Sequence, residues 1–227
     1  MPVTVAKRCV RPPTSGSEIP FSLQPWVSLG KMSNNCYAYA VNDFDFFRVQ
    51  KSSPGNTMRM KNNRRLPQYN TIEGLQKRML LDNPKKIYKT SACTKCRTGF
   101  YKIMMFAAMG GGDLQDFHYY KQHSMAEYRV KPTDTFKKVA TFFKVPVDRI
   151  KKASGGPLRP GQTIKFRANF WSHKRGYGTG PLLVDAQGRP IRNPITANRS
   201  YPGLNYSTYG GSFCVKNKGI QVGKTYM

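Results

Sequence analysis

Two short segments with alternating side chains, far apart in the sequence, constrain the fold of this chain most strongly. DFHYYKQHS covers residues 116–124, and NFWSHKRG covers residues 169–176. Both alternate in the manner of β-strands and are typical of the two arms of one antiparallel hairpin. The residues between them then form an insertion at the hairpin tip, which leaves the arms paired if its own ends are adjacent. If His118 opposes His173, Tyr120 opposes Trp171 on the same face.

The inserted segment has its own order of elements. YRV at 128–130 predicts a short strand, and Asp134 or Thr135 then caps an amphipathic helix. Pro146 opens a second helix, and TIKF at 163–166 predicts a closing strand. We therefore expect a βααβ module whose two strands are adjacent and antiparallel.

The turns of this module carry a resemblance to a known family. KPTDT at 131–135 and LRPGQ at 158–162 are similar to the turns of the lysin motif (LysM), although Thr133 stands where that family usually has Gly. The resemblance covers 128–166 and implies a groove for N-acetylglucosamine-containing glycans, peptidoglycan or chitin. The glycan-binding residues it implies are Thr133, Asp134, Thr135, Gly155, Gly156, Pro157 and Leu158. The alternative is a protein–protein docking module, which the basic stretch KVPVDRIKKAS favours.

The chain divides into four parts on this interpretation. Residues 1–31, rich in Pro and Ser, predict an extended N-terminal arm, and residues 216–227 predict a C-terminal tail. The LysM-like insertion covers 126–168. The two halves of a host domain lie on either side of it, at 32–125 and 169–215, and the expected fold class is α+β.

Local signals place the first elements of the host domain. Polar caps predict a helix over 34–47, and a basic loop is expected to follow over 48–70. A threonine cap predicts a second helix over 71–82. The apolar run 100–108 predicts a buried strand that ends at the glycines 110–112.

The host motifs carry a second resemblance. The motifs are NNCYAYA at 34–40, CRTGFYKIMMFA at 96–107, DFHYYKQ at 116–122, WSHKRG at 171–176 and GGSFCV at 210–215. They resemble a little-characterised family of proteins from bacteria and large DNA viruses. By fold-level analogy, that family is similar to the papain-like amidases and cell-wall peptidases. The resemblance implies a papain-like host with a cysteine at a helix start and a histidine on a later strand.

The residues themselves supply the parts of a Cys–His hydrolase. Cys36 follows polar caps at an expected helix start, where the helix dipole and free N–H groups lower the pKa of a thiol. His118 is the candidate base, and His173, Asp116 or Asn169 would orient its imidazole. The alternative is that Cys36 is a small buried apolar residue and the histidines are satisfied core or surface groups. The catalytic set Cys36, His118 and His173 would then be vestigial.

The charge balance indicates an anionic partner. The chain has 38 Lys and Arg against 11 Asp and Glu, a formal charge of +27, and no acidic residue follows Asp185. Self-repulsion of this size opposes compaction unless an anionic surface compensates for it. The chain shows no zinc-finger spacing, no RNP motif and no helix-turn-helix. Non-specific contact with packaged DNA stays open because it needs only Lys and Arg.

The apolar runs and the cysteines limit which other classes of protein this chain can belong to. The longest apolar run, Ile103 to Met109, is too short to span a bilayer, so we expect no transmembrane segment. The N-terminus has no stretch that resembles a signal peptide, so we expect synthesis in a reducing cytosol. Contact with an anionic inner membrane stays open. Cys93 and Cys96 form a C-x-x-C without a second pair; a zinc half-site, a redox pair and core thiols are the alternatives, and we favour core thiols. No metal and no cofactor is expected.

These observations together favour a structural role. We expect a minor capsid or cement protein of a large double-stranded DNA virus, made in the host cytoplasm and located in the virion. Its partners would be the acidic surfaces of other capsid proteins. The alternative is a cysteine amidase or peptidase that acts on cell-wall material and is targeted by its LysM-like module.

Overall fold

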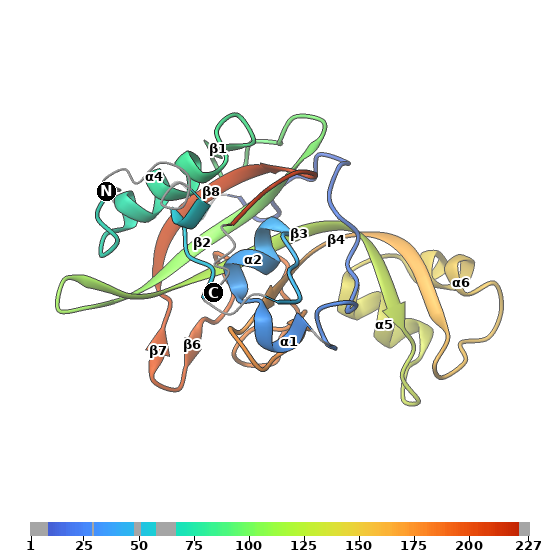
Figure 1. Ribbon diagram of the computed structural model, residues 1–227. Coiled ribbons are helices and arrows are strands. Elements are labelled where there is room, and N and C mark those ends of the chain that lie inside the picture. Colours follow the sequence, from blue (N-terminus) through green and yellow to red (C-terminus); the bar gives the residue numbers. More distant parts are fainter. Residues whose placement is uncertain (1–8, 29, 48–50, 58–66, 223–227) are drawn as a thin grey trace.

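The computed structural model describes residues 9–28, 30–47, 51–57 and 67–222. The chain combines α-helices with an antiparallel sheet, which confirms the expected α+β class (Figure 1). The helices are α1 (Gly30–Ser33), α2 (Cys36–Val41), α4 (Ile72–Asp82), α5 (Phe136–Phe143) and α6 (Val147–Ser154). The strands are β1 (Ile87–Thr90), β2 (Phe100–Gly110), β3 (Asp113–Arg129), β4 (Thr163–Lys174), β5 (Pro181–Leu182), β6 (Ser200–Tyr201), β7 (Leu204–Asn205) and β8 (Thr208–Lys216).

A six-stranded sheet lies at the centre of the molecule. Its order is β1-β8-β2-β3-β4-β5, and every neighbouring pair is antiparallel. β2 and β3 meet at Gly111 and Gly112, whose φ values of 60° and 89° lie in the region that glycine enters without strain. β3 and β4 form a longer hairpin that carries α5 and α6 at its far end (Figure 1).

Packed side chains cover both faces of the sheet. α2 and α4 pack on one face, where Tyr101, Ile103 and Phe117 are buried. The opposite face buries Phe106 and Trp171 beneath the chain that leads from Ile191 to Tyr206. Alternation along β2 and β3 therefore supplies apolar side chains to two cores at once.

The segment around α5 and α6 has the expected βααβ order. Tyr128 pairs with Ile164 and Arg129 pairs with Thr163. Thr135 caps α5, because its Oγ1 accepts from the Lys138 backbone N–H at 3.1 Å. The core beneath the two helices also contains Phe21 and Phe170, which lie outside 126–168, so this segment shares its core with the rest of the chain.

The register of the long hairpin differs from our expectation by two residues. Tyr120 opposes His173 and Gln122 opposes Trp171, so His118 is a diagonal neighbour of His173. A bulge between His123 and Met125 shifts the ladder where the host pairing meets the pairing of the βααβ segment.

The described parts of the two terminal segments belong to the packed fold. Phe21 and Trp26 are buried, and the Phe21 N–H donates to Met125 O at 3.0 Å. Ile220 and Val222 pack in the same core as α2. Residues 9–28 and 216–222 are thus integral to the domain, whereas 1–8 and 223–227 lie outside the described residues.

The first host helix is shorter than the expected 34–47. α2 ends at Val41 because Asn42 adopts a left-handed conformation (φ 58°) and donates its N–H to Ala38 O and Tyr39 O. In the expected loop 48–70, residues 48–50 and 58–66 lie outside the described residues.

One cysteine of the C-x-x-C is not a free thiol. Cys96 forms a disulfide with Cys214, which joins the loop before β2 to the middle of β8. Our expectation of core thiols is therefore wrong for both cysteines of the motif, because Cys96 is in a disulfide and the free Cys93 is exposed, whereas Cys9 and Cys36 are free and buried. The disulfide depends on long-range pairing, so the local C-x-x-C spacing could not predict it.

Candidate functional site

Side-chain caps hold the start of α2 in place. The Asn35 Oδ1 accepts from the Ala38 N–H at 3.1 Å, and its Nδ2 donates to Ser52 O at 2.7 Å. Asn34 bonds both the N–H and the carbonyl of Asp45. The expected polar caps therefore exist, and they fix Cys36 as the first residue of the helix.

The Cys36 thiol lies against the backbone of β3 on either side of His118. Its Sγ donates to Phe117 O at 3.6 Å, and the Tyr119 backbone also hydrogen-bonds the sulfur. Burial and the nearby Asp116 carboxylate raise the pKa of Cys36 to about 12, although Lys51, the Tyr119 N–H and Lys174 act in the opposite direction. Cys36 is thus a protonated thiol at neutral pH.

His118 and His173 form a directed hydrogen-bond relay. His118 Nε2 lies 2.7 Å from His173 Nδ1, and His173 Nε2 lies 2.9 Å from Val184 O. A carbonyl accepts only, so His173 carries its proton on Nε2 and accepts at Nδ1 from His118. In neutral His118 the remaining lone pair is therefore on Nδ1, as a general base requires.

Both histidines are held in their neutral forms. Burial, the neighbouring His173, and the Arg175 and Arg199 guanidiniums hold the pKa of His118 well below its usual range. Burial lowers the pKa of His173 to about 4, even though its bond to Val184 O opposes the shift. Tyr120 stacks on His173 with ring centroids 5.0 Å apart and fixes the imidazole plane.

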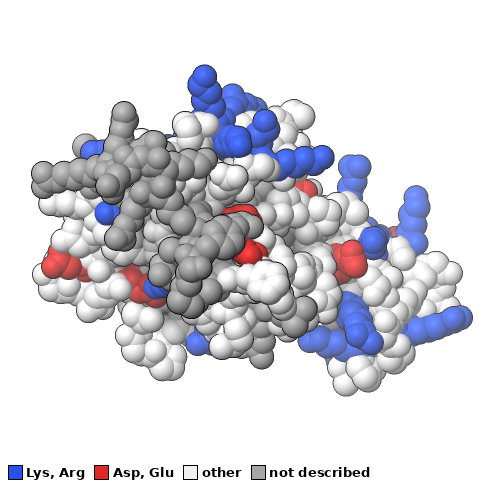
Figure 2. Space-filling view, viewed as in Figure 1, with Lys and Arg blue, Asp and Glu red and all other residues white. Residues whose placement is uncertain are grey.

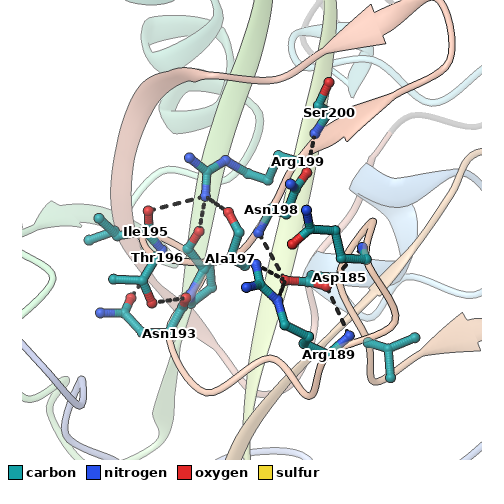
Figure 3. A network of polar contacts seen from close by, with 12 residues as sticks. Asp185, Arg189, Asn193, Ile195, Thr196, Ala197, Asn198, Arg199 and Ser200 are labelled. Carbon is teal, nitrogen blue, oxygen red and sulfur yellow. Dashed lines mark hydrogen bonds and ion pairs between the residues drawn. The ribbon is translucent and has the colours of Figure 1, made fainter.

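A network of polar contacts stabilises the segment from Asp185 to Ser200, which follows the carbonyl that ends the relay (Figure 3). Asp185 accepts from the backbone N–H groups of Gln187, Arg189 and Asn198. Arg199 donates to the carbonyls of Pro194, Ile195 and Ala197 and lies 4.0 Å from the Phe106 ring centroid. This segment is thereby fixed on the sheet face that carries both histidines.

A hollow of about 250 Å³ adjoins His118. Its lining includes Lys51, Asp116, Arg175 and Tyr206. Asp116 accepts from Lys51 Nζ at 2.9 Å and from the Tyr206 hydroxyl at 2.7 Å. Sequence reasoning missed Lys51 and Tyr206, because no local pattern distinguishes them from the other lysines and tyrosines.

The structure joins only part of the predicted catalytic set. Of the three candidate orienting groups, His173 bonds His118, whereas Asp116 bonds Lys51 and Tyr206, and Asn169 bonds Gln122. Within the described residues no hydrogen bond joins the Cys36 and His118 side chains. Cys36 is 4% exposed and does not line the hollow. Cys36 thus lies beside the strand that carries His118 without a hydrogen bond to its imidazole among the described residues.

Several of the glycan-binding residues implied by the LysM resemblance make hydrogen bonds or packing contacts within the βααβ segment itself. The Asp134 carboxylate accepts from the Tyr128 hydroxyl at 2.7 Å and from the Lys131 N–H at 2.8 Å. Thr133 O accepts from Lys138 Nζ, and Thr135 caps α5. On the other side, Gly155 ends α6 at φ 64°, Gly156 O accepts from Ser154 Oγ, Pro157 is exposed, and Leu158 packs against the core.

Comparisons with protein-family models, curated proteins and solved structures found no match to this chain. Among the described residues, no helix has the length and apolar character needed to cross a bilayer. The same residues contain no group of three or more His, Cys, Asp or Glu that could hold a metal ion.

Proposed function

We propose that this chain is a structural component, a minor capsid or cement protein, of a large double-stranded DNA virus particle. It docks through its basic surface to the acidic faces of neighbouring proteins. The observation that carries this proposal is how the acidic side chains are used.

Many of the eleven carboxylates serve the chain's own backbone. The carboxylates that accept from backbone N–H groups are those of Glu18, Asp43, Asp45, Asp82, Asp134 and Asp185. Each of these groups stabilises a turn, a cap or a loop. The bonds made by Asp43 and Asp82 join segments far apart in the sequence. The formal charge of +27 already counts all eleven carboxylates, so a large positive surplus remains.

Basic side chains project outward around α5 and α6. Figure 2 shows Lys and Arg side chains extending from the end of the molecule that α5 and α6 form, with few acidic side chains on the same face. Lys151 and Lys165 pair with Asp148 and Glu127 at 3.6 and 3.3 Å, and these exposed pairs contribute little. An acidic partner would lower the self-repulsion of the +27 chain and speed its association.

Two further observations support a structural role in a particle. Disulfides persist on virion surfaces and are rare in the cytosol, and Cys96 and Cys214 form one. The Cys36 thiol is buried and protonated, and among the described residues no hydrogen bond joins it to the neutral His118 side chain, which does not favour an assembled Cys–His pair. The viral setting itself rests on the resemblance of the host motifs.

We expect the purified chain to bind poly-L-glutamate saturably at low salt, and its dissociation constant to rise at least about tenfold between roughly 50 and 200 mM salt. Fluorescence titration measures this. Duplex DNA and vesicles with anionic lipid serve as comparison ligands at matched charge concentration. Tighter binding to either of these than to the acidic polypeptide would contradict docking to acidic proteins.

A cysteine hydrolase is the second candidate, and the His118–His173–Val184 relay favours it. His118 Nδ1 would remove the Cys36 proton, and the thiolate would attack an amide carbonyl of cell-wall material. The amine would leave with that proton, and water would then hydrolyse the thioester. The thiol pKa of about 12 opposes the first step, because proton transfer to an imidazole with a pKa below 6.5 costs roughly 7 kcal/mol or more.

We expect Cys93, which is exposed, to react with iodoacetamide at about pH 7, while Cys36 reacts only after unfolding, because the thiolate is the nucleophile. Peptide mass spectrometry after timed labelling distinguishes the two sites, and Cys93→Ser provides a background without the exposed thiol. Rapid labelling of Cys36 in the folded protein, together with cleavage of a peptidoglycan fragment, would place the hydrolase first.

A further inference from the structure

The β3–β4 hairpin is irregular where the βααβ segment joins the rest of the chain. The register shifts between His123 and Met125, and Ser124, Ala168 and Asn169 lie at this irregularity. The carbonyls of Arg167 and Asn169 accept hydrogen bonds from arginines of other segments. Arg149 of α6 donates to Arg167 O at 3.0 Å, and Arg11 donates to Asn169 O at 3.3 Å.

These two bonds gather guanidinium groups around one hollow. A cavity of about 430 Å³ is lined by Arg11, Arg149 and Arg167, together with the polar residues Thr14, Ser124 and Asn169. Arg11 comes from the N-terminal segment, Arg149 from α6 and Arg167 from β4. Among the described residues that line it there is no Asp or Glu.

The guanidinium groups keep most of their donors for a ligand. Arg11 uses Nη2 and Arg149 uses Nη1 in the bonds to β4, which leaves the other N–H groups of each fork. In the described part of the chain, no hydrogen bond or ion pair engages the Arg167 guanidinium. Three cations that line one hollow repel one another, and a bound anion would remove that repulsion.

We propose that the cavity lined by Arg11, Arg149 and Arg167 binds a multiply charged oxyanion, a phosphoryl group. Guanidinium forks match the oxygen atoms of phosphate in pairs, and a dianion offers enough oxygen atoms for more than one fork. Thr14 and Ser124, whose hydroxyls can act as uncharged donors, also line the cavity. This site is separate from the hollow beside His118 and goes beyond docking to acidic proteins.

The test uses the whole chain, with inorganic phosphate and pyrophosphate as probes. We expect saturable binding in isothermal titration calorimetry at constant ionic strength, with pyrophosphate tighter than phosphate. Replacing Arg149 and Arg167 together by glutamine should weaken pyrophosphate binding about a hundredfold, roughly tenfold for each lost charged fork.

Arg159→Gln is the control for the loss of one positive charge, because Arg159 lies in an exposed turn near α6 and does not line the cavity. We expect it to change the affinity less than twofold, a range that charge screening alone explains. Arg149→Lys keeps the charge but not the fork and should give an intermediate loss.

Two results would overturn the phosphoryl site. One is the absence of saturable pyrophosphate binding by the folded wild-type chain; the other is equal weakening by the double variant and by Arg159→Gln. The proposal fails independently of the docking function, because poly-L-glutamate binding to the double variant reports on the remaining basic surface. Loss of pyrophosphate binding with poly-L-glutamate binding retained would assign the cavity to the phosphoryl group alone.

Discussion

The free energy of unfolding is expected to fall steeply as the pH is lowered from about 6.5 to about 4.5, because three buried histidines stay neutral in the folded state. His118, His123 and His173 are nearly fully buried, and burial is the first cause of the lowered pKa of each. The pKa of His123 is about 3 and that of His173 is about 4.

The free energy of unfolding falls with decreasing pH because the folded-state pKa values of these histidines lie below the usual imidazole pKa. Between these values the unfolded chain binds protons that the folded chain excludes, so the stability present at neutral pH is lost as the pH falls. Each such histidine removes about 1.4 kcal/mol for every pH unit below 6.5, and three remove roughly 4 kcal/mol per unit. That slope would exhaust a typical domain stability of roughly 5–15 kcal/mol within a few units.

Urea unfolding monitored by tryptophan fluorescence, repeated across this pH range, measures the slope. His123→Gln is the informative variant, because an amide can still donate to Ile19 O and reach Ser172 Oγ while it does not titrate. Its slope should be lower by about 1.4 kcal/mol per pH unit. Asp185, whose pKa backbone hydrogen bonds lower despite burial, acts only below this range. A stability that stays constant down to about pH 5 would refute the assignment of neutral buried histidines.

The sequence correctly predicted the helices and the turn whose ends are fixed by residues close together in the chain. Thr71 caps α4 and Thr135 caps α5, as side-chain oxygens at those positions do in isolated helices. The glycines after β2 form the expected turn. The end of α2 at Asn42 was missed, because an asparagine in a helical pattern is compatible with both continuation and a left-handed cap.

The features that the sequence did not predict depend on contacts between residues far apart in the chain. Residues 1–31 were predicted to form an extended arm because they are rich in Pro and Ser, yet Phe21 and Trp26 are buried against distant strands and helices. The bulge beside His123 shifted the hairpin register, and no residue in either arm signals a bulge. Pairing of Cys96 with Cys214 depends on β8 lying next to β2, which is a property of the sheet order.

Of the candidate site, the sequence predicted the contact between two histidines but not the electrostatics of the thiol. The His118–His173 contact follows from both residues lying on one sheet face, which alternation predicts even when the register is off by two. A helix N-terminus was expected to lower the thiol pKa of Cys36. α2 has six residues and all of them are buried, so desolvation outweighs the small dipole and raises the pKa to about 12.

Replacing Lys121 by methionine is expected to stabilise the protein at neutral pH. Lys121 is 2% exposed, and burial lowers its pKa to about 7. Among the described residues, Lys121 Nζ contacts the Asn42 side-chain oxygen at 3.2 Å and the Tyr39 and Trp26 rings, with centroids 4.0 and 5.5 Å away. None of these groups carries a negative charge to compensate the ammonium.

The expected gain depends on pH in a defined direction. The folded-state pKa lies below the unfolded value of about 10.5, so the folded chain gains stability as the pH rises through this range and the amine becomes neutral in both states. Near pH 7 the shift corresponds to at most roughly 4–5 kcal/mol of desolvation, of which methionine should recover about 2 kcal/mol or more after its lost ring contacts. The advantage should shrink as the pH approaches about 10.

Lys121→Arg is the matched control, because a guanidinium keeps its charge at every accessible pH and should destabilise the protein throughout. Asn42 is exposed, so water replaces its bond to Lys121 in the methionine variant and no buried polar group is orphaned. Urea unfolding at about pH 7 and about pH 10 compares the cost of burying the ammonium with its attraction to the aromatic rings. A methionine variant less stable than the wild type at both values would mean that attraction to the Tyr39 and Trp26 rings exceeds the cost of burying the ammonium.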